Sequence, residues 1–373
     1  MTSFIGIDLF CGAGGMSEGF RQSGIKIIAA VEADAINAET HKINFEDCKT
    51  ICKDIQYISK DEILDNISPI KEIDVVFGGP PCQGFSVIGK RKPDDYRNFL
   101  LFEFARIVSE LKPKYFVLEN VQGLLFKESR PYIEKFFEIM SSSGYSVAPP
   151  LLLNAQNFGV PQRRKRAFII GHLPNLTKPN LDLLRRQETQ APTVWEAIGD
   201  LPNIEDYEYL LTQDTYTGKL SKSCSDYAAI LRGDLPDPIT NIYHKKTDQI
   251  GLSGCLRTNH HADIRKRFSE TLPGSIEPIS RFYRLSPTGV SPTLRAGSDR
   301  SHGTYTAPRP IHPIYARCIS VREAARLHSF PDYFQFHPTK YNGYRQIGNS
   351  VPPLLARAVA NTIIAALREN GEK

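Results

Sequence analysis

The segment FIGIDLFCGAGGMSEGF, residues 4–20, contains an apolar run that leads directly into a glycine-rich turn and then into residues with helical spacing. This order predicts a strand, a tight turn and a helix. Gly12, Gly14 and Gly15 would allow the backbone to approach a ligand closely and would leave N–H groups free at the start of the helix. A tight turn without a ligand would have the same composition. The spacing differs from the GxGxxG pattern, which argues against a nicotinamide-dependent oxidoreductase.

Short apolar runs alternate with amphipathic segments through the first half of the chain, which is typical of an α/β fold with a largely parallel sheet. The expected strands are residues 3–9, 27–31, 73–78, 115–119 and 167–171, and the expected helices are residues 35–44, 101–111 and 131–143. Glu32 follows the second strand, where its carboxylate is suited to binding ribose hydroxyls. Asp54 follows an expected third strand and is suited to accept a hydrogen bond from an adenine amino group.

The length of the chain, 373 residues, exceeds the size at which a single core stops growing, so two domains are expected. An irregular stretch rich in Pro, Gly, Ser, Thr and Tyr covers residues 201–319, and amphipathic helices return at residues 320–327 and 353–368. We therefore predict one domain from residues 1–200 and 320–373, and a second domain from residues 201–319.

Charge is distributed unevenly in the predicted second domain. Residues 199–240 contain eight acidic and three basic side chains, whereas residues 257–300 contain eight basic and four acidic ones. The basic half is therefore the better candidate for contacts with phosphate groups. The net charge of the whole chain, +5, permits a polyanionic partner without requiring one.

Composition also argues against several classes of protein. The seven cysteines form no CxxC pair, so neither a zinc site nor a disulfide framework is expected. The opening residues lack a basic region followed by a long apolar stretch, and no apolar run approaches the roughly 18 residues that a membrane span needs. We expect a reduced, cytoplasmic protein without a metal or a membrane segment.

The most informative segment is VVFGGPPCQGFSVIGK, residues 75–90. An apolar strand ends in two glycines and two prolines and presents Cys82 at the carboxyl end of the sheet, where open α/β folds bind their ligands. An isolated cysteine is usually a small buried hydrophobe. Here the prolines stiffen the approach and a polar loop follows, which favours a reactive thiol. The loop, residues 84–96, is predicted to be a lid over the site, and an ordinary surface loop is the alternative.

A carboxylate and a cluster of arginines lie near the next two strands. In KYFVLENVQGL, residues 114–124, Glu119 ends an apolar run. A strand-end carboxylate is often solvated, but burial among apolar neighbours would favour the protonated form, which can donate to a ring nitrogen. The cluster QRRKR, residues 162–166, precedes a strand and could form a solvated face or a phosphate contact. Alternation would turn Arg164 and Arg166 to the same side, so that one of them could reach the site.

Taken in order, these motifs resemble those of the DNA cytosine-5 methyltransferase family, of the bacterial restriction–modification type. FIGIDLFCGAGG resembles the family's cofactor loop, GGPPCQGFS its nucleophile loop, ENV its carboxylate motif and QRRKR its arginine motif. ISVREAARLHSFPDYF, residues 319–334, is similar to the motif that supports the recognition domain. QIGNSVPPLLARAVA, residues 346–360, is similar to the final motif, whose loop returns to the cofactor pocket. The similarity spans the chain apart from roughly residues 206–277.

The resemblance implies a fold, a cofactor and a set of site residues. The implied fold is the Rossmann-like mixed sheet of S-adenosylmethionine-dependent methyltransferases, with helices on both faces and a smaller, irregular target-recognition domain. The implied catalytic residues are Cys82, Glu119, Arg164 and Arg166. The implied cofactor-binding residues are Phe10, Gly12, Ala13, Gly14, Gly15, Glu32, Asp54, Ile55, Pro81, Leu100, Asn349, Ser350 and Val351. The expected DNA-binding residues are Ser86, Lys90, Arg91, Gln162, Arg163, Arg257, Arg281, Arg284, Arg295 and Arg300.

The implied reaction begins with addition of the Cys82 thiolate to carbon 6 of cytosine, which makes carbon 5 nucleophilic enough to take a methyl group. Glu119 would neutralise charge at ring nitrogen 3, and Arg166 would stabilise the exocyclic oxygen. The base would have to be flipped out of the duplex.

The resemblance also implies double-stranded DNA as the partner of a monomeric, nucleoid-associated protein, with a restriction endonuclease as a functional counterpart but not as a stable complex. Two alternatives remain open: an RNA (tRNA) cytosine-5 methyltransferase and a catalytically silent DNA-binding relative. The long variable segment favours DNA, because sequence readout needs its own surface. The intact Cys82, Glu119 and Arg166 argue against a silent relative.

Overall fold

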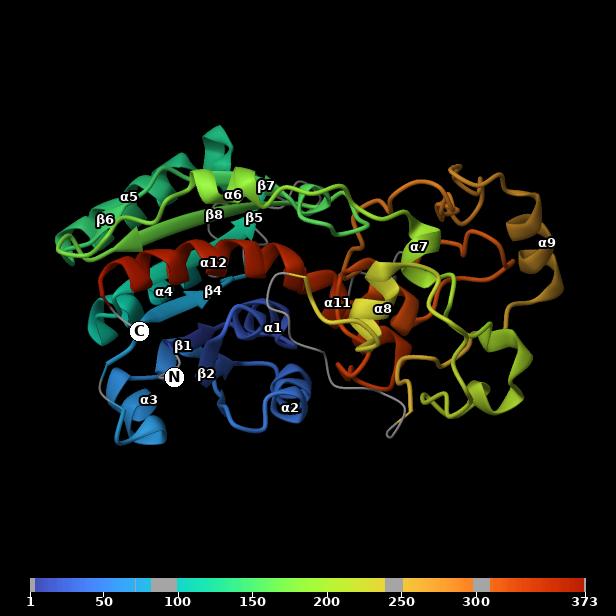
Figure 1. Cartoon of the computed structure of the whole chain (residues 1–373), viewed down its shortest axis with the longest axis horizontal. Coiled ribbons are helices and arrows are strands. Elements are labelled where there is room, and N and C mark those ends of the chain that lie inside the picture. The colour runs from blue at the N-terminus through green and yellow to red at the C-terminus, as the bar shows by residue number, and fades with distance from the viewer. Residues whose placement is uncertain (1–3, 71, 82–98, 239–250, 298–308, 372–373) are drawn as a thin grey trace. The chain divides into compact units, whose positions relative to one another are not determined.

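The computed structural model describes residues 4–70, 72–81, 99–238, 251–297 and 309–371 (Figure 1). The chain divides into two compact units. The first comprises Met1–Asn154, Lys165–Glu188 and Leu355–Lys373, and the second comprises Ala155–Arg164 and Thr189–Leu354. The predicted boundaries placed residues 155–164, 189–200 and 320–354 in the first domain, whereas in the structure these residues pack with the second unit. The packing of the second unit, described below, explains this difference.

A mixed sheet forms the centre of the first unit. In the described part of the chain it has eight strands in the order β3-β2-β1-β4-β5-β8-β6, and β7 also pairs with β8. The strands are β1 (Phe4–Leu9), β2 (Ile25–Glu32), β3 (Lys49–Cys52), β4 (Val75–Gly78), β5 (Tyr115–Val121), β6 (Ser146–Val147), β7 (Leu151–Asn154) and β8 (Lys165–His172). Strands β1 to β5 pair in parallel, and β8 is antiparallel to β5, β6 and β7. The predicted Rossmann-like mixed sheet is confirmed.

Helices cover both faces of this sheet. They are α1 (Gly15–Gln22), α2 (Ala35–Asn44), α3 (Lys60–Ile67), α4 (Leu100–Leu111), α5 (Arg130–Ser142), α6 (Asp182–Arg186) and α12 (Pro353–Glu369). On one face, Phe116 of β5 packs with Phe104 of α4 and Phe136 of α5 in the main core. On the other face, Phe77 of β4 stacks on Phe20 of α1 with ring centroids 3.8 Å apart. Successive strand residues point to opposite faces, so each strand contributes to both cores.

Helix α12 runs along the second face of the sheet (Figure 1). The hydroxyl of Ser23, after α1, donates to the carbonyl of Arg357. The amide of Asn370, just beyond α12, donates to the hydroxyl of Tyr115 on β5. In the described chain, the stretch Lys340–Glu369 is long and apolar enough to cross a membrane by length and composition alone, but 78% of its apolar window is buried inside the protein. That degree of burial is typical of a core helix.

The second unit is less regular. Its helices are α7 (Val194–Ile198), α8 (Asp226–Arg232), α9 (Ala262–Glu270), α10 (Val321–Leu327) and α11 (Lys340–Asn349). A fully buried ionic network lies among them: Arg326 binds both carboxylate oxygens of Asp332, at 2.5 and 2.6 Å, and approaches Asp200 at 3.4 Å. Arg232 also pairs with Asp200. Because buried charges require these partners, the network holds the segments around residues 200 and 320–332 within this unit.

His312, in the second unit, must remain neutral in the folded protein. Its side chain is 2% exposed, and its Nδ1 atom accepts the backbone N–H groups of Ile314 and Tyr315 at 3.1 and 3.0 Å. Burial lowers the pKa of His312 to about 3, although Glu323, 3.5 Å from Nε2, acts in the opposite direction. The nearby Arg317 and Arg284 lower it further.

This environment predicts a pH dependence of stability. Between the ordinary histidine pKa and the lowered one, the unfolded chain binds a proton that the folded chain does not. We therefore expect His312 to reduce the free energy of unfolding by about 1.4 kcal/mol for each pH unit below about 6.5, down to about pH 4. Urea unfolding from pH 7 to pH 4 should give a steeper dependence for the wild type than for His312→Gln. Identical slopes in the two proteins would contradict this account.

Candidate active site

The predicted functional segments of the first unit lie together at the carboxyl ends of its parallel strands. The strand order reverses between β1 and β4, and ligands of open α/β folds bind beside such a switch point, at the carboxyl ends of the strands. The glycine-rich turn follows β1, Glu32 ends β2, and the Gly79–Pro81 turn follows β4. Because β8 is antiparallel to β5, the first residues of β8 lie beside the carboxyl end of β5, with Arg166 opposite Val121.

Glu119 and Arg166 form a buried ion pair at this end of the sheet. The Nε atom of Arg166 lies 2.8 Å from Oε1 of Glu119, and the two side chains are 12% and 10% exposed. Burial lowers the pKa of Arg166, and the neighbouring Glu119 counteracts that effect. A guanidinium at this distance also stabilises the ionised carboxylate. For Glu119 to take the predicted protonated form, its ion pair with Arg166 must therefore weaken.

One hydrogen bond and one steric constraint link the surroundings of this ion pair to the turn that follows β4. The side-chain amide of Asn120, a buried residue, donates to the carbonyl of Pro80 at 3.1 Å and accepts the backbone N–H of Val121 at 2.9 Å. A Cβ atom placed on Gly79 would lie 2.7 Å from Oε2 of Glu119, closer than real Cβ contacts allow. Sequence reasoning missed both Gly79 and Asn120, although their positions beside Pro80 and Glu119 were a usable signal.

We predict that Gly79→Ala lowers the turnover number about 10- to 100-fold while cofactor affinity changes little. The added methyl group must displace the Glu119 carboxylate, and misplacement of a catalytic group by about 1 Å can cost on the order of 100-fold. Single-turnover assays of the methyl transfer that the family resemblance implies, and titration with the implied cofactor, would measure the two effects. Gly289→Ala is the matched control, because a Cβ there meets only Ser286 atoms at 3.4 Å or more. A Gly79→Ala enzyme as fast as this control would contradict the prediction.

Cys82 and the expected lid lie outside the described residues, as do the predicted DNA contacts Ser86, Lys90, Arg91 and Arg300. Pro81, immediately before Cys82, is exposed. The structure therefore describes the turn as far as Pro81, the residue before the predicted nucleophile.

The glycine-rich turn has the backbone geometry of a close-approach loop. Gly14 has a φ of +103°, and a Cβ on it would lie 2.4 Å from the ring of Phe45. Gly12 has a φ of +55°, and a Cβ on it would meet nothing within 4 Å, so the turn borders open space there. Phe10 also has a positive φ, +63°, which is uncommon outside glycine and clusters at functional sites.

Glu32 is fixed beside this turn. Its Oε2 atom accepts the N–H of Gly12 and its Oε1 atom accepts the N–H of Asp34, both at 2.8 Å. Burial raises the pKa of Glu32, and these two backbone hydrogen bonds act against that rise. Asp54 accepts the N–H of Gln56 at 3.1 Å and so caps the short helical turn Ile55–Tyr57. Ala13, Ile55 and Leu100 are buried in the first unit.

A polar cluster that sequence reasoning missed lies behind the turn. Ser17 of α1 donates to Asp8 at 2.6 Å, and its hydroxyl lies 3.1 Å from Nε2 of His41. All three side chains are buried, and burial raises the pKa of Asp8 to about 8. The serine lies between the acid and the histidine, which is not the order of a hydrolytic triad. The cluster instead connects β1 with α1 and α2.

Arg164 and Gln162 are buried in the second unit, which speaks against their predicted contacts with substrate. Arg164 is 1% exposed and donates to the carbonyls of Leu294, Gly348 and Ser350 at 2.8, 2.6 and 2.9 Å. It thereby holds the loop of the final motif, which also contains Asn349 and Val351. Gln162 is 0% exposed, and its amide binds Leu294 and His328. Because β8 begins at Lys165, Arg164 lies outside the strand, and the alternation of side chains along β8 does not apply to it.

The predicted DNA-binding arginines separate into two groups. Arg163, Arg281 and Arg295 are exposed and remain candidates. Arg284 is 8% exposed and donates to the carbonyls of Phe268, Ser269, Thr271 and Ile314, so its position speaks against a DNA contact. Arg257 is half-buried and donates to the carbonyl of Glu205. Within the described residues no group of three or more His, Cys, Asp or Glu side chains could hold a metal ion.

Comparison with known proteins identifies the family. A family model described as C-5 cytosine-specific DNA methylase matches residues 4–365. The Type II methyltransferase M.XorII of Xanthomonas oryzae pv. oryzae is 48% identical over 376 residues, which cover 100% of this chain and 87% of that protein. M.DdeI of Desulfomicrobium norvegicum, also a Type II methyltransferase, is 33% identical over 96% of this chain and 88% of its own.

A solved structure shows the same relationship. The crystal structure of a DNA modification methyltransferase encoded within an E. coli prophage has a TM-score of 0.81 and 32% identity, and the match covers 98% of this chain and 100% of that one. The chain belongs to the C-5 cytosine-specific DNA methylase family and is a DNA (cytosine-5-)methyltransferase.

Proposed function

We propose that this enzyme transfers a methyl group from S-adenosylmethionine to carbon 5 of a flipped cytosine within a specific sequence of double-stranded DNA, through a covalent bond to Cys82. The observation that supports this most is the buried Glu119–Arg166 pair, whose neighbours Gly79 and Asn120 fix the turn leading to Cys82. A carboxylate and a guanidinium at the carboxyl end of the sheet, beside the turn that precedes Cys82 in the sequence, suit the chemistry that cytosine requires.

Each residue has a separate role in the proposed reaction. Cys82 forms a bond to carbon 6 of the base, which raises electron density at carbon 5. Arg166 donates to the exocyclic oxygen as charge builds on the ring. When Arg166 engages that oxygen, it neutralises the Glu119 carboxylate less, which favours a protonated Glu119 that donates to ring nitrogen 3. Loss of the carbon 5 proton then allows Cys82 to leave and the ring to regain its aromaticity.

The residues of the first unit fit S-adenosylmethionine. The cofactor would supply an electrophilic methyl group on a sulfonium. The open space beside Gly12 gives room for close backbone approach, and the uncapped start of α1 at Gly14 offers N–H groups. Glu32 would bind the ribose hydroxyls and Asp54 the adenine amino group. Phe10, Ala13, Gly15, Ile55, Pro81 and Leu100 would complete this part of the site. The family resemblance also assigns cofactor binding to Asn349, Ser350 and Val351, whose loop Arg164 supports.

Recognition of the target sequence is assigned to residues 201–319, with residues 1–200 and 320–373 responsible for chemistry. Phosphate contacts position a protein on DNA, whereas base-edge contacts select the sequence. Within this segment, the exposed Arg281 and Arg295 are the described residues best suited to contact phosphates or base edges. Arg163, which lies outside the segment, is hydrogen-bonded through its backbone to Ser291 and Thr293. By analogy with its Type II relatives, we propose that the enzyme is a cytoplasmic, nucleoid-associated monomer that protects DNA from a separately acting endonuclease.

The proposed function can be tested by methyl transfer from labelled S-adenosylmethionine to duplex DNA and, in parallel, to tRNA. We expect label in duplex DNA only, at cytosines of one sequence when the product is mapped by bisulfite sequencing. Label in tRNA alone would instead support the RNA methyltransferase alternative. No turnover on either substrate, with cofactor bound, would support the silent relative.

A further inference from the structure

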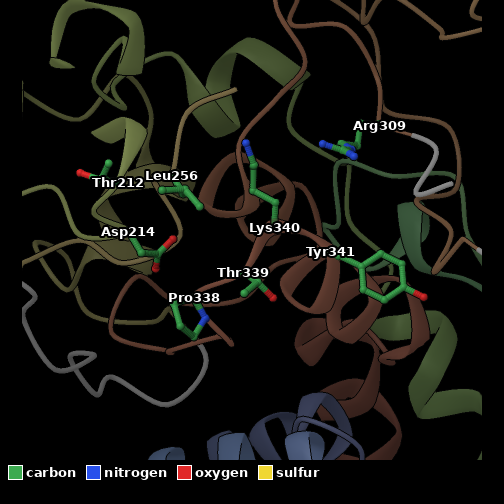
Figure 2. A pocket seen from close by; sticks show the side chains of 8 residues that line it. All are labelled: Thr212, Asp214, Leu256, Arg309, Pro338, Thr339, Lys340 and Tyr341. Atoms are coloured by element: carbon green, nitrogen blue, oxygen red, sulfur yellow. The ribbon is translucent and has the colours of Figure 1, made fainter. Parts of the chain in front are cut away.

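A cavity of about 470 Å³ lies entirely within the second unit (Figure 2). Its lining residues are Thr212, Asp214, Leu256, Arg309, Pro338, Thr339, Lys340 and Tyr341. None of these residues has a role in the proposed chemistry. Two of them, Arg309 and Lys340, are cations that share one cavity, and their surroundings differ from those of the paired arginines elsewhere in this unit.

Arg309 lacks an anionic partner among the described residues. Its guanidinium lies over the ring of Tyr344, 5.4 Å from the centroid, and its buried Nε atom has no hydrogen-bond acceptor. Other buried arginines of the unit have acceptors for their guanidinium groups: Arg326 binds Asp332, Arg317 binds Glu323, and Arg284 binds backbone carbonyls. A guanidinium without an acceptor is therefore available to an external anion.

Lys340 is held in the same cavity by neutral groups only. Its ammonium donates to the carbonyl of Arg257 and to the hydroxyl of Thr258, both at 3.0 Å, which leaves one of its three protons free. Burial lowers the pKa of Lys340, and the charge of Arg309 lowers it further. Two partly buried cations that line one cavity, without a carboxylate of the described residues bound to either, are suited to an anion.

Apart from Asp214, the remaining lining residues are uncharged. Asp214 is the acidic residue of the lining, and its Oδ2 atom is bound by the N–H of Gly254 at 2.8 Å. Figure 2 shows Asp214 across the cavity from Arg309, with Lys340 between them. Thr339 immediately precedes α11 and makes no side-chain cap, so backbone N–H groups at the start of the helix add positive potential beside Lys340.

We propose that this cavity binds one phosphate group of the DNA backbone, with Arg309 and Lys340 as its ligands. The proposal rests on the proposed DNA-methylating function. A phosphodiester carries a single negative charge and presents two oxygens, which match the planar donors of arginine and the remaining proton of lysine. Such a contact would position the duplex on the second unit without reading its sequence.

The test compares the wild type with Arg309→Gln/Lys340→Gln, in which glutamine retains donors to the neighbouring carbonyls. Binding of the full chain to a 20-base-pair duplex would be measured between 50 and 200 mM NaCl. Each phosphate contact contributes a slope of about −0.9 to a plot of the logarithm of the association constant against the logarithm of the salt concentration. The slope of the variant should therefore be shallower by about one. Its affinity should fall by a similar factor on target and non-target duplexes. Lys219→Gln/Lys222→Gln, at two exposed lysines of the acidic half, is the control for removing two positive charges.

The outcomes separate this site from the proposed function. An unchanged slope in a folded variant would overturn the phosphate site, and methylation of duplex DNA by the wild type would leave the function standing. A wild type that neither binds nor methylates duplex DNA would overturn both. Inorganic phosphate is the third arm: if it raises the unfolding temperature of the wild type and not of the variant while the DNA slope stays the same, the cavity binds free phosphate and the DNA assignment is wrong.

Discussion

Cys82→Ser is expected to abolish detectable methyl transfer while leaving cofactor affinity within about twofold of the wild type. A serine hydroxyl is far less nucleophilic than a thiolate at neutral pH, so carbon 6 of cytosine would not be attacked and carbon 5 would stay unreactive. The residues proposed to bind the cofactor, including Glu32 and the glycine-rich turn, are untouched by this change. Rate measurements on target duplex and calorimetric titration of the cofactor would establish both effects.

The matched control for this substitution is Cys224→Ser. Cys224 is an exposed free cysteine of the second unit, and its sulfur donates only to nearby groups such as the carbonyl of Trp195. A serine can replace that donor, so we expect wild-type turnover. Substantial turnover by Cys82→Ser would mean that the nucleophile lies elsewhere in the chain.

Glu119→Gln is expected to lower the rate of the chemical step by two or more orders of magnitude, again with little change in cofactor affinity. The amide can still donate a hydrogen bond to a ring nitrogen, but it cannot transfer a proton. The change also removes the carboxylate that lies 2.8 Å from Arg166 and leaves a buried guanidinium without its counter-charge. Single-turnover kinetics with cofactor in excess would isolate the chemical step.

Glu134→Gln is the control for Glu119→Gln, since Glu134 pairs with Arg130 on the exposed surface of α5 and lies away from the sheet edge. If the Glu119→Gln rate fell by less than about tenfold, the contribution of proton donation would be below about 1.4 kcal/mol, and the proposed role of Glu119 would be wrong. Rescue of the variant at low pH is not expected, because the missing proton cannot be restored to an amide.

The fold of the first unit could be predicted where the local pattern was strong. The predicted helix at residues 35–44 has the same bounds as α2, and the expected strand at residues 3–9 corresponds to β1. Alternating apolar runs determine these elements without reference to the rest of the chain. The two-residue strand β6 and the direction of β8 could not be predicted, because pairing partners far apart in sequence determine them.

The candidate site shows the same division between local and non-local information. Glu119 was singled out from its position at a strand end, and Arg166 by the family resemblance after alternation had left Arg164 and Arg166 open. The structure places Glu119 and Arg166 in contact. Arg164, two residues from Arg166, has a very different environment because it leaves the strand and donates to carbonyls more than 100 residues away. No local pattern distinguishes a buried structural arginine from a catalytic one.

The measurement that tests the central claim most directly is covalent trapping on a duplex whose target cytosine carries fluorine at carbon 5. After methyl transfer the fluorine cannot leave as a proton does, so Cys82 cannot be expelled and the enzyme should remain bonded to the base. We predict a complex that survives denaturation, needs S-adenosylmethionine, and yields a DNA-linked peptide containing Cys82 on mass spectrometry. Methylation of ordinary cytosine without any trapped complex, or a complex linked through another residue, would contradict the account.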